Sequence, residues 1–161
     1  MGGIRSDLCP GSLVVPDQII DYTWGRKSTF HENSDEPVVH IDFTEPYDDG
    51  VRRRILAAGV TAGQPIVDGA VYAATQGPRL ETAAEINRLE RDGADLVGMT
   101  GMPEAALARE LGIPYAAINV VANFAAGRAS SEHEICFDSI DAVLREAMGR
   151  VRNVLDHLCE A

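Results

Sequence analysis

The stretch that decides the fold runs from Thr75 to Glu104 and reads TQGPRLETAAEINRLERDGADLVGMTGMPE. An apolar run ends where this stretch begins, and its first four residues, Thr-Gln-Gly-Pro, are typical of a sharp turn. Apolar residues at helical spacing then predict a helix over 81–91, which Gly93 ends. The apolar run over 95–99 predicts a short buried strand. The stretch therefore reads as strand, turn, helix and strand, an order typical of α/β proteins.

Polar side chains follow both predicted strands of this stretch. Arg79 and Glu81 come after the turn that ends the first strand, and Met99 and Thr100 come at the end of the second. In open parallel sheets, ligands bind just beyond the carboxyl ends of the strands. We therefore expect these side chains to converge on one binding site.

The rest of the chain alternates between strand and helix patterns. Four further segments have strand patterns: 10–20 with a break at Pro16, 38–43, 65–75 as one long strand, and 113–122 as a central strand buried on both faces. Three further segments have helix patterns: 47–62, 103–111, and a last helix capped by Asp138 and Ser139. A polar segment over 21–37 predicts a long loop. The alternation predicts an α/β fold with a largely parallel or mixed sheet.

Length, composition and charge limit the function classes. A chain of 161 residues with 45% hydrophobic and 24% charged residues suits one domain with one sizeable core. Its net charge of −11 argues against nucleic acid as a partner, because phosphate contacts need clustered Lys and Arg. No apolar run approaches the length of a membrane span and no signal peptide is recognised, so we expect a cytoplasmic protein without a membrane partner. Cys9, Cys136 and Cys159 lack metal-ligand spacing, so we expect reduced, structural cysteines and no metal site.

Ordered blocks of sequence along nearly the whole chain resemble the family of trimeric purine nucleoside phosphorylases and methylthioadenosine phosphorylases. The blocks are PGSLVVPDQIID (10–21), HIDFTEPY (40–47), GPRLETAAE (77–85), GADLVGMTGMPEAALARELGI (93–113), VVANF (120–124) and DSIDAVL (138–144). The resemblance implies a three-layer α/β fold with a central mixed sheet flanked by helices, assembled as a homotrimer. It also implies reversible phosphorolysis of an N-glycosidic bond, which releases a purine and a pentose 1-phosphate. Inorganic phosphate is then the co-substrate, and no other cofactor is expected.

The resemblance also assigns the residues that read the base. Members that act on 6-oxopurines carry a Glu and an Asn at the positions of Glu81 and Asn123, whereas members that act on 6-aminopurines carry a Ser and an Asp. The chemistry agrees, because a carboxylate accepts a hydrogen bond from N1–H of a 6-oxopurine and an amide donates to N7. We therefore expect a hypoxanthine- or guanine-type base, with Asn123 as the catalytic residue that assists its departure. Phe124 and Ala125 are expected beside the base.

Sugar and phosphate contacts follow from the same resemblance. Met99 is expected under the ribose, Thr100 is expected to donate its hydroxyl to phosphate, and His40 is expected to reach the 5′ end of the sugar in a neighbouring subunit. Arg79 is expected to brace the site. Met99 and His40 also fit a purely structural role, Met99 as a core residue and His40 as a histidine packed beside apolar residues.

The 5′ position of the sugar separates two kinds of substrate. Ile140 stands where ordinary purine nucleoside phosphorylases place a His for the ribose 5′-hydroxyl, and Leu144 is apolar too. An apolar lining favours a thioether, because a buried hydroxyl without a partner costs about 1–3 kcal/mol. We therefore expect S-methyl-5′-thioinosine as the substrate, with hypoxanthine and 5-methylthioribose 1-phosphate as products. Both residues also belong to the apolar stripe of the last predicted helix.

Three other interpretations stay open. The first keeps the chemistry but assigns S-methyl-5′-thioadenosine or purine nucleosides in general, and the second replaces phosphate by water. The third is a chain that binds purines or joins intact subunits without catalysis. It arises because, in the family, the glycines that match Gly2 and Gly3 follow several strands and helices, and those elements carry a glycine-rich phosphate loop. We accordingly expect the 161 residues to correspond to the C-terminal portion of a family member.

Overall fold

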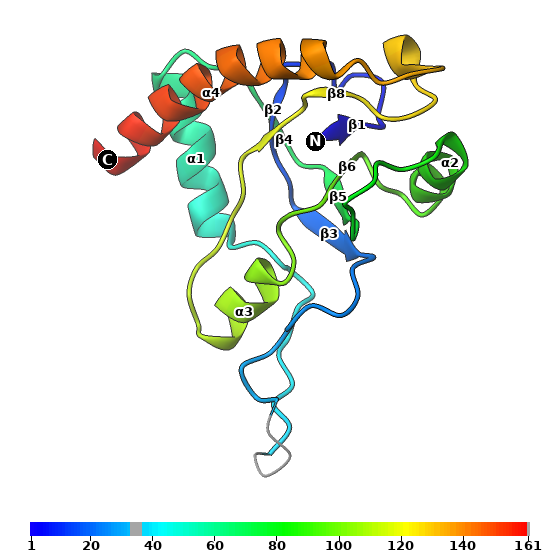
Figure 1. Cartoon of the computed structure of the whole chain (residues 1–161). Helices are drawn as coiled ribbons and strands as arrows, with labels where there is room; N and C mark the ends of the chain where they lie inside the picture. Colours follow the sequence, from blue (N-terminus) through cyan, green and yellow to red (C-terminus); the bar gives the residue numbers. More distant parts are fainter. Residues whose placement is uncertain (33–36, 161) are drawn as a thin grey trace.

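Two small β-sheets form the centre of the protein (Figure 1). The computed structural model of the protein describes residues 1–32 and 37–160. Within these residues the larger sheet has the strand order β3-β5-β6-β1-β8, and the smaller sheet has the order β4-β2-β7. The strands are β1 (Gly2–Gly3), β2 (Leu13–Val15), β3 (Gln18–Asp21), β4 (Ile66–Asp68), β5 (Val71–Ala74), β6 (Leu96–Gly98), β7 (Asn119–Val120) and β8 (Asn123–Phe124).

Strand directions make the larger sheet a mixed one. β3, β5 and β6 run parallel, whereas β1 is antiparallel to β6 and β8 is parallel to β1. The carboxyl end of β6 therefore lies at the same edge of the sheet as the amino ends of β1 and β8. This edge is where the sequence placed its site residues.

Helices flank the sheets, and their bounds in the described part of the chain are α1 (Asp49–Thr61), α2 (Ala83–Arg91), α3 (Glu104–Glu110) and α4 (Phe137–Glu160), with a short 3₁₀ helix, η1 (Ala129–Ser131). Figure 1 shows α4 along the top of the molecule, α2 at the right and α1 at the left. Ile55 and Ala58 of α1 pack with Val154 of α4 and with Val15 of β2 in one buried cluster. The mixed sheets and flanking helices confirm the predicted α/β class.

A second buried cluster lies under the larger sheet and fixes the position of α2. Ile86 and Leu89 of α2 are 0% and 4% exposed and pack with Val97 of β6 and Ala73 of β5. Burying a side chain of this kind contributes about 1.5–3 kcal/mol. The segment before α2, which carries Arg79 and Glu81, is thereby held close to the sheet.

The long strand predicted over 65–75 is wrong, because the chain changes sheets in the middle of it. β4 pairs with β2 in the smaller sheet, and β5 pairs with β3 and β6 in the larger one. Between them Gly69 has φ of +84°, which a side chain would resist, and Ala70 N–H donates to Asp17 Oδ1 at 2.7 Å. Alternation of apolar residues continues through this change of sheet, so periodicity could not detect it.

The buried central strand predicted over 113–122 is also largely wrong. Only Asn119 and Val120 form a strand, β7, which pairs with β2. Ile113 is 55% exposed, and Pro114 has no N–H to give to a ladder. No strand of the described structure lies beside 113–118, so its apolar residues pack without a ladder.

Two smaller predictions need correction. Residues 38–43 form no strand; Val38 is 78% exposed, and Asp42 accepts hydrogen bonds from the N–H and hydroxyl of Thr44 in a local turn. The last helix begins at Phe137, one residue before its predicted cap, and Ser139 Oγ donates to the carbonyl of Cys136. The other predicted helices and the strands around Pro16 are confirmed to within a few residues.

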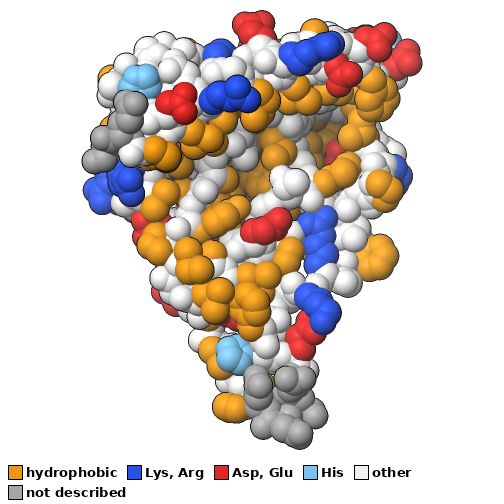
Figure 2. All heavy atoms as spheres, turned by 60° about the vertical axis from the view of Figure 1, so that its left-hand side comes forward, with side chains coloured by type: hydrophobic (Ala, Val, Ile, Leu, Met, Phe, Trp, Pro, Cys, Tyr) orange, Lys and Arg blue, Asp and Glu red, His pale blue; other side chains and the backbone are white. Residues whose placement is uncertain are grey.

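The surface of one face is strongly apolar. Figure 2 shows hydrophobic side chains gathered across the middle of this face, with charged side chains along the top. The described residues include several large hydrophobic side chains that are more than half exposed: Trp24, Phe30, Val38, Val60, Leu111, Ile113, Phe137 and Met148. Among the described helices, none is long and apolar enough to cross a membrane.

Candidate functional site

The predicted site residues come together at one edge of the larger sheet. Thr75 follows β5, Met99 and Thr100 follow β6, and Asn123 begins β8. The strand register pairs Ala74 with Gly98, Gly2 with Val97, and Gly2 with Asn123. Asn123 is thus separated from β6 only by β1, and two strand spacings amount to roughly 10 Å. A purine nucleoside is long enough to touch groups at this separation.

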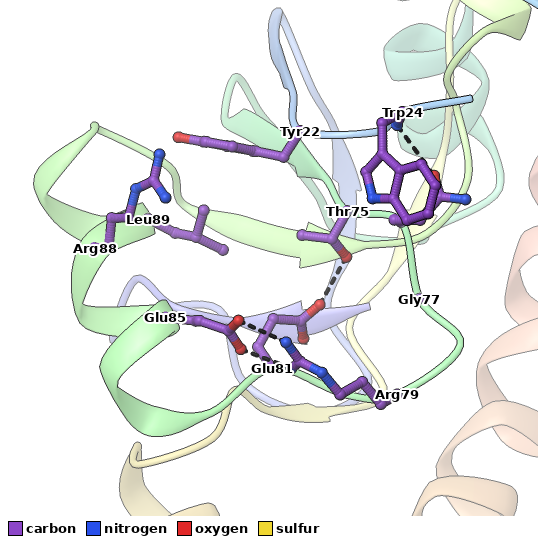
Figure 3. Close-up of a pocket in the computed structure, with 10 residues that line it drawn as sticks. Tyr22, Trp24, Thr75, Gly77, Arg79, Glu81, Glu85, Arg88 and Leu89 are labelled. Atoms are coloured by element: carbon purple, nitrogen blue, oxygen red, sulfur yellow. Dashed lines mark hydrogen bonds and ion pairs between the residues drawn. The ribbon is translucent and has the colours of Figure 1, made fainter. Parts of the chain in front are cut away.

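Thr75 holds the carboxylate of Glu81 beside this edge. The Thr75 hydroxyl lies 2.6 Å from Glu81 Oε1 and 3.2 Å from the carbonyl oxygen of Gly98, and its single proton serves one acceptor at a time. Figure 3 shows the Glu81 side chain directed toward Thr75. Among the described residues, no group donates a hydrogen bond to Glu81 Oε2. This second oxygen is therefore free to accept a hydrogen bond from a ligand.

Glu81 is not the residue that caps helix α2. Thr82 is the N-cap, and its side chain and that of Glu85 form a reciprocal capping box. Arg79 donates two hydrogen bonds to the Glu85 carboxylate, at 2.7 and 2.8 Å (Figure 3). Glu85 therefore supplies the carboxylate that caps the N-terminus of α2, and Glu81 has no capping role. Arg79 is engaged with α2, as a bracing residue would be.

The pKa of Glu85 gives a prediction about pH. The Arg79 guanidinium and the Thr82 N–H lower the pKa of this carboxyl to about 2. A lowered pKa means that the stabilisation is present above the ordinary value of 4.5 and disappears as the pH falls toward 2. Glu85→Gln is therefore expected to lower the melting temperature at pH 7, by an amount that shrinks as the pH falls below 4.5. Thermal melts of both proteins across this range test it; a difference that does not depend on pH would contradict it.

Met99 and Thr100 occupy a tightly held turn after β6. A Cβ added at Gly77 would lie 2.4 Å from Met99 Sδ, so the thioether packs directly on the glycine of the GPR turn. The N–H of Thr100 donates to the Tyr72 hydroxyl at 3.0 Å, and Thr100 Oγ1 lies 3.5 Å from the same hydroxyl. Thr100 is exposed, so its own hydroxyl proton is available to an anion.

Asn123 presents a half-buried amide at the start of β8. Its Nδ2 donates to the carbonyl of Phe124 at 2.6 Å. An amide nitrogen carries two protons, so one N–H and the carbonyl oxygen have no partner among the described residues. Sequence analysis predicted Asn123 at the end of a strand, whereas Asn123 is the first residue of β8. The chain crosses from β7 to β8 at residues 121–122, and the mixed sheet brings Asn123 to the same edge.

The other predicted residues lie at varying distances from this edge. Phe124 is half-buried, and Ala125 is 2% exposed in the cluster beneath α2, so its side chain lies behind the site surface. Ile140 and Leu144 are half-buried on the first turns of α4. His40 is exposed in an irregular segment. Among the described residues, His40 and Glu81 form no hydrogen bond or ion pair with each other.

Two hollows meet at Glu81. One, of about 330 Å³, lies between α2 and the segment after β3, and Trp24, Thr75 and Arg88 help to line it (Figure 3). The other, of about 360 Å³, is lined by the segment before α2 and by residues 126–137. Asn123 and Ile140 line neither, but both belong to elements that adjoin the second: β8 runs into residues 126–127, and Ile140 lies one helical turn after Phe137. Glu81 thus borders both hollows, and Asn123 borders neither.

Sequence reasoning missed three residues that shape the site: Arg26, Tyr72 and Thr75. Thr75 was detectable as the first polar residue after an apolar run. Tyr72 looked like an ordinary strand residue and is 1% exposed. Arg26 lies in a polar loop, where nothing in the local sequence indicates that it returns to the sheet.

Cysteines and acidic residues offer little further chemistry. Cys9, Cys136 and Cys159 are free, as expected, but all three are exposed, so the prediction that they are structural is wrong. In the described residues, no three His, Cys, Asp or Glu side chains are grouped in a way that could hold a metal ion.

Comparison with known proteins places this geometry in context. The family profile described as the phosphorylase superfamily matches residues 1–160. The chain is 51% identical over 151 residues to a probable S-methyl-5′-thioinosine phosphorylase of Xanthomonas campestris pv. campestris, covering 94% of this chain and 57% of the relative. It is 44% identical to a 6-oxopurine nucleoside phosphorylase of Pyrococcus furiosus, covering 79% of this chain and 50% of the relative.

A comparison with solved structures also finds a similar phosphorylase. Methylthioadenosine phosphorylase from Schistosoma mansoni in complex with adenine superposes with a TM-score of 0.89 at 30% identity, covering 98% of this chain and 61% of that one. The chain spans 57% to 65% of the length of the first four curated relatives.

Proposed function

The chain belongs to the phosphorylase superfamily, and from that premise we propose that it forms the base- and sugar-binding part of a 6-oxopurine nucleoside phosphorylase. The proposed reaction transfers the pentose of S-methyl-5′-thioinosine to phosphate and releases hypoxanthine. The names of the relatives support both the chemistry and the choice of a 6-oxopurine.

One observation carries the proposal: at one edge of the sheet, Glu81 and Asn123 offer complementary groups that have no partner among the described residues. Glu81 Oε2 accepts from N1–H of the base, and the second N–H of Asn123 donates to N7. An adenine offers no hydrogen at N1, so a carboxylate there faces a lone pair. An adenine would leave polar groups of the site without the partners that a 6-oxopurine gives them. Each such group costs about 1–3 kcal/mol of binding free energy, which discriminates against adenine.

The same contacts serve the bond-breaking step. As the C1′–N9 bond breaks, its electron pair passes to the purine, and the sugar acquires oxocarbenium character until a phosphate oxygen bonds to C1′. Negative charge develops on N7 and O6, where the Asn123 N–H stabilises it more strongly than in the ground state. Thr100 donates its hydroxyl to phosphate. In the described residues it is the one exposed hydroxyl at the end of β6, so we expect slow turnover by the 161-residue chain alone.

Assembly completes the proposed site. We place His40 at the 5′ end of the sugar of a neighbouring subunit in a homotrimer, because it is exposed and the family that the chain resembles has a His in this role. In the proposed trimer, the exposed apolar side chains of the described surface would be available for contacts between subunits.

Binding and turnover test the proposal together. Calorimetric titration is expected to give at least about tenfold tighter binding of hypoxanthine than of adenine, equivalent to one unpaired polar contact. Hypoxanthine release from S-methyl-5′-thioinosine is expected only when phosphate is present. Release without phosphate would establish hydrolysis instead, and tighter binding of adenine would reject the base assignment. Hypoxanthine binding without any release would favour a purine-binding chain that does not catalyse.

The 5′ preference gives a separate prediction. Ile140→His is expected to improve binding of inosine relative to S-methyl-5′-thioinosine by about tenfold, because a His can pair with the 5′-hydroxyl that Ile140 leaves without a partner. Leu155→His, on the exposed side of the same helix, is the control and is expected to change neither affinity. Competition titrations with both nucleosides measure the ratio. A wild-type chain that already prefers inosine would contradict the assignment of the apolar 5′ pocket.

A further inference from the structure

Arg26 reaches from the loop after β3 back to the edge of the larger sheet. Its Nη2, which carries two protons, lies within hydrogen-bond distance of the carbonyl oxygens of Met99 at 3.0 Å, Thr75 at 3.2 Å and Gln76 at 3.3 Å. Nη1 donates to the carbonyl of Met102, and Nε lies 3.3 Å from Gln76 Oε1. One side chain therefore contacts the segments that follow two neighbouring strands.

These contacts are of a kind that only an arginine provides. Carbonyls beyond the ends of strands lack ladder partners and must be satisfied in another way. The guanidinium is planar and has five N–H donors in a rigid fork, whereas a lysine has a single flexible ammonium. In the described part of the chain no carboxylate forms a salt bridge with Arg26. The side chain thus serves the backbone of the two segments and is not half of an ion pair.

Both segments carry residues of the proposed site. The Thr75 hydroxyl holds Glu81, and the Met99 side chain packs on Gly77 of the same turn. The next residue, Thr100, is fixed from the other side, because its N–H donates to the buried hydroxyl of Tyr72 on β5. Movement of the Met99 carbonyl would therefore shift the thioether and the hydroxyl donor relative to the Glu81 carboxylate.

We propose that Arg26 is a positioning residue that sets the distance between the base-reading segment at Thr75–Gln76 and the sugar- and phosphate-binding segment at Met99–Thr100. Its guanidinium does not touch the substrate; it acts through the four carbonyls. The inference rests on the proposed function, because it assigns Arg26 to the same site. It predicts that a nucleoside, which must contact both segments at once, depends on Arg26 more than a free base does.

The experiment compares three variants of the whole chain. Arg26→Lys keeps the charge and loses the fork, Arg26→Ala opens a space for free guanidinium, and Arg150→Lys is the matched control. Arg150 is also half-buried and also binds a carbonyl and a side-chain amide, Gly11 O and Gln64 Oε1 at 2.8 Å, but it lies on α4. Titrations with S-methyl-5′-thioinosine and with hypoxanthine measure the two affinities, and the ¹H–¹⁵N amide spectrum follows Thr75 and Thr100.

The expected result is a split between the two ligands. Arg26→Lys is expected to weaken nucleoside binding by about tenfold or more, since a misplacement of about 1 Å in a site costs up to on the order of 100-fold. The affinity for hypoxanthine is expected to fall by a smaller factor. Added guanidinium is expected to restore nucleoside binding to Arg26→Ala. The amide signals of Thr75 and Thr100 are expected to shift in the Arg26 variants and to stay in place in Arg150→Lys.

Other results overturn the inference in distinguishable ways. Equal losses for both ligands without rescue by guanidinium would show a role in general stability. Wild-type affinities in both Arg26 variants would show that the carbonyl contacts do not position the site. If the wild-type chain binds neither ligand, the proposed function fails for this chain, and unshifted amide signals of Thr75 and Thr100 in the Arg26 variants would still reject the positioning role.

Discussion

Asn123→Asp is expected to shift the base preference of the chain from hypoxanthine toward adenine. The amide donates to N7, whereas an ionised carboxylate repels N7 and O6 of hypoxanthine and can instead accept a hydrogen bond from the 6-amino group of adenine. Loss of this paired contact is expected to weaken hypoxanthine binding by about 2 kcal/mol. That corresponds to roughly 30-fold in the dissociation constant. Titrations with both bases, and competing-substrate kinetics of the phosphorolysis reaction, give the ratio.

A matched control separates base recognition from a general effect of the added charge. Asn153 is another half-buried asparagine whose Nδ2 donates to a backbone carbonyl, that of Ala62 at 3.3 Å, and it lies on α4. Asn153→Asp is expected to leave the ratio of the two affinities unchanged. An unchanged ratio in Asn123→Asp as well would remove Asn123 from the base site.

Gly77→Ala is expected to be a strongly damaging small substitution near the site. Gly77 has φ of +65°, a conformation that costs an L-residue about 1–2 kcal/mol. The new Cβ would also lie 2.4 Å from Met99 Sδ, and overpacking of this kind costs about 1–3 kcal/mol. The summed loss of unfolding free energy is roughly 2–5 kcal/mol. Urea unfolding measures it, and titration with S-methyl-5′-thioinosine is expected to show weaker binding because Met99 must move.

Gly63→Ala isolates the backbone part of this effect. Gly63 has the same φ of +65°, but a Cβ added there meets no atom within 4 Å. Its substitution is expected to cost only about 1–2 kcal/mol and to leave ligand binding unchanged. Equal losses in the two variants would show that the contact between Gly77 and Met99 carries no energy.

Local sequence determined the elements that need only their neighbours along the chain. The helix at 81–91 was predicted from spacing, and its start is marked by Thr82 and Glu85 three residues later, a capping pair formed entirely within one turn. The turn at Gly77 was equally local, and the apolar run at 95–99 was predicted to be a strand and found partners in β5 and β1. The base-reading pair, Glu81 and Asn123, came from chemistry and from the resemblance to a family, and the family is confirmed.

Tertiary structure decided which strands have partners. Residues 65–75 and 113–122 have the apolar content of strands, but a strand forms only where another backbone supplies the ladder. Gly69 sends the chain from one sheet to the other, and 113–118 has no neighbouring strand in the described structure. Periodicity records which side chains are apolar and not which backbone lies alongside.

The site itself needed both levels. Sequence alone determined that a carboxylate, a thioether, a hydroxyl and an amide stand near the ends of strands. Asn123 reaches the edge that carries Thr75 and Met99 only because β1 and β8 run antiparallel to β6. Only the fold returns Arg26 to that edge, because hydrogen bonds between residues about fifty to seventy positions apart depend on the whole packing and leave no local pattern.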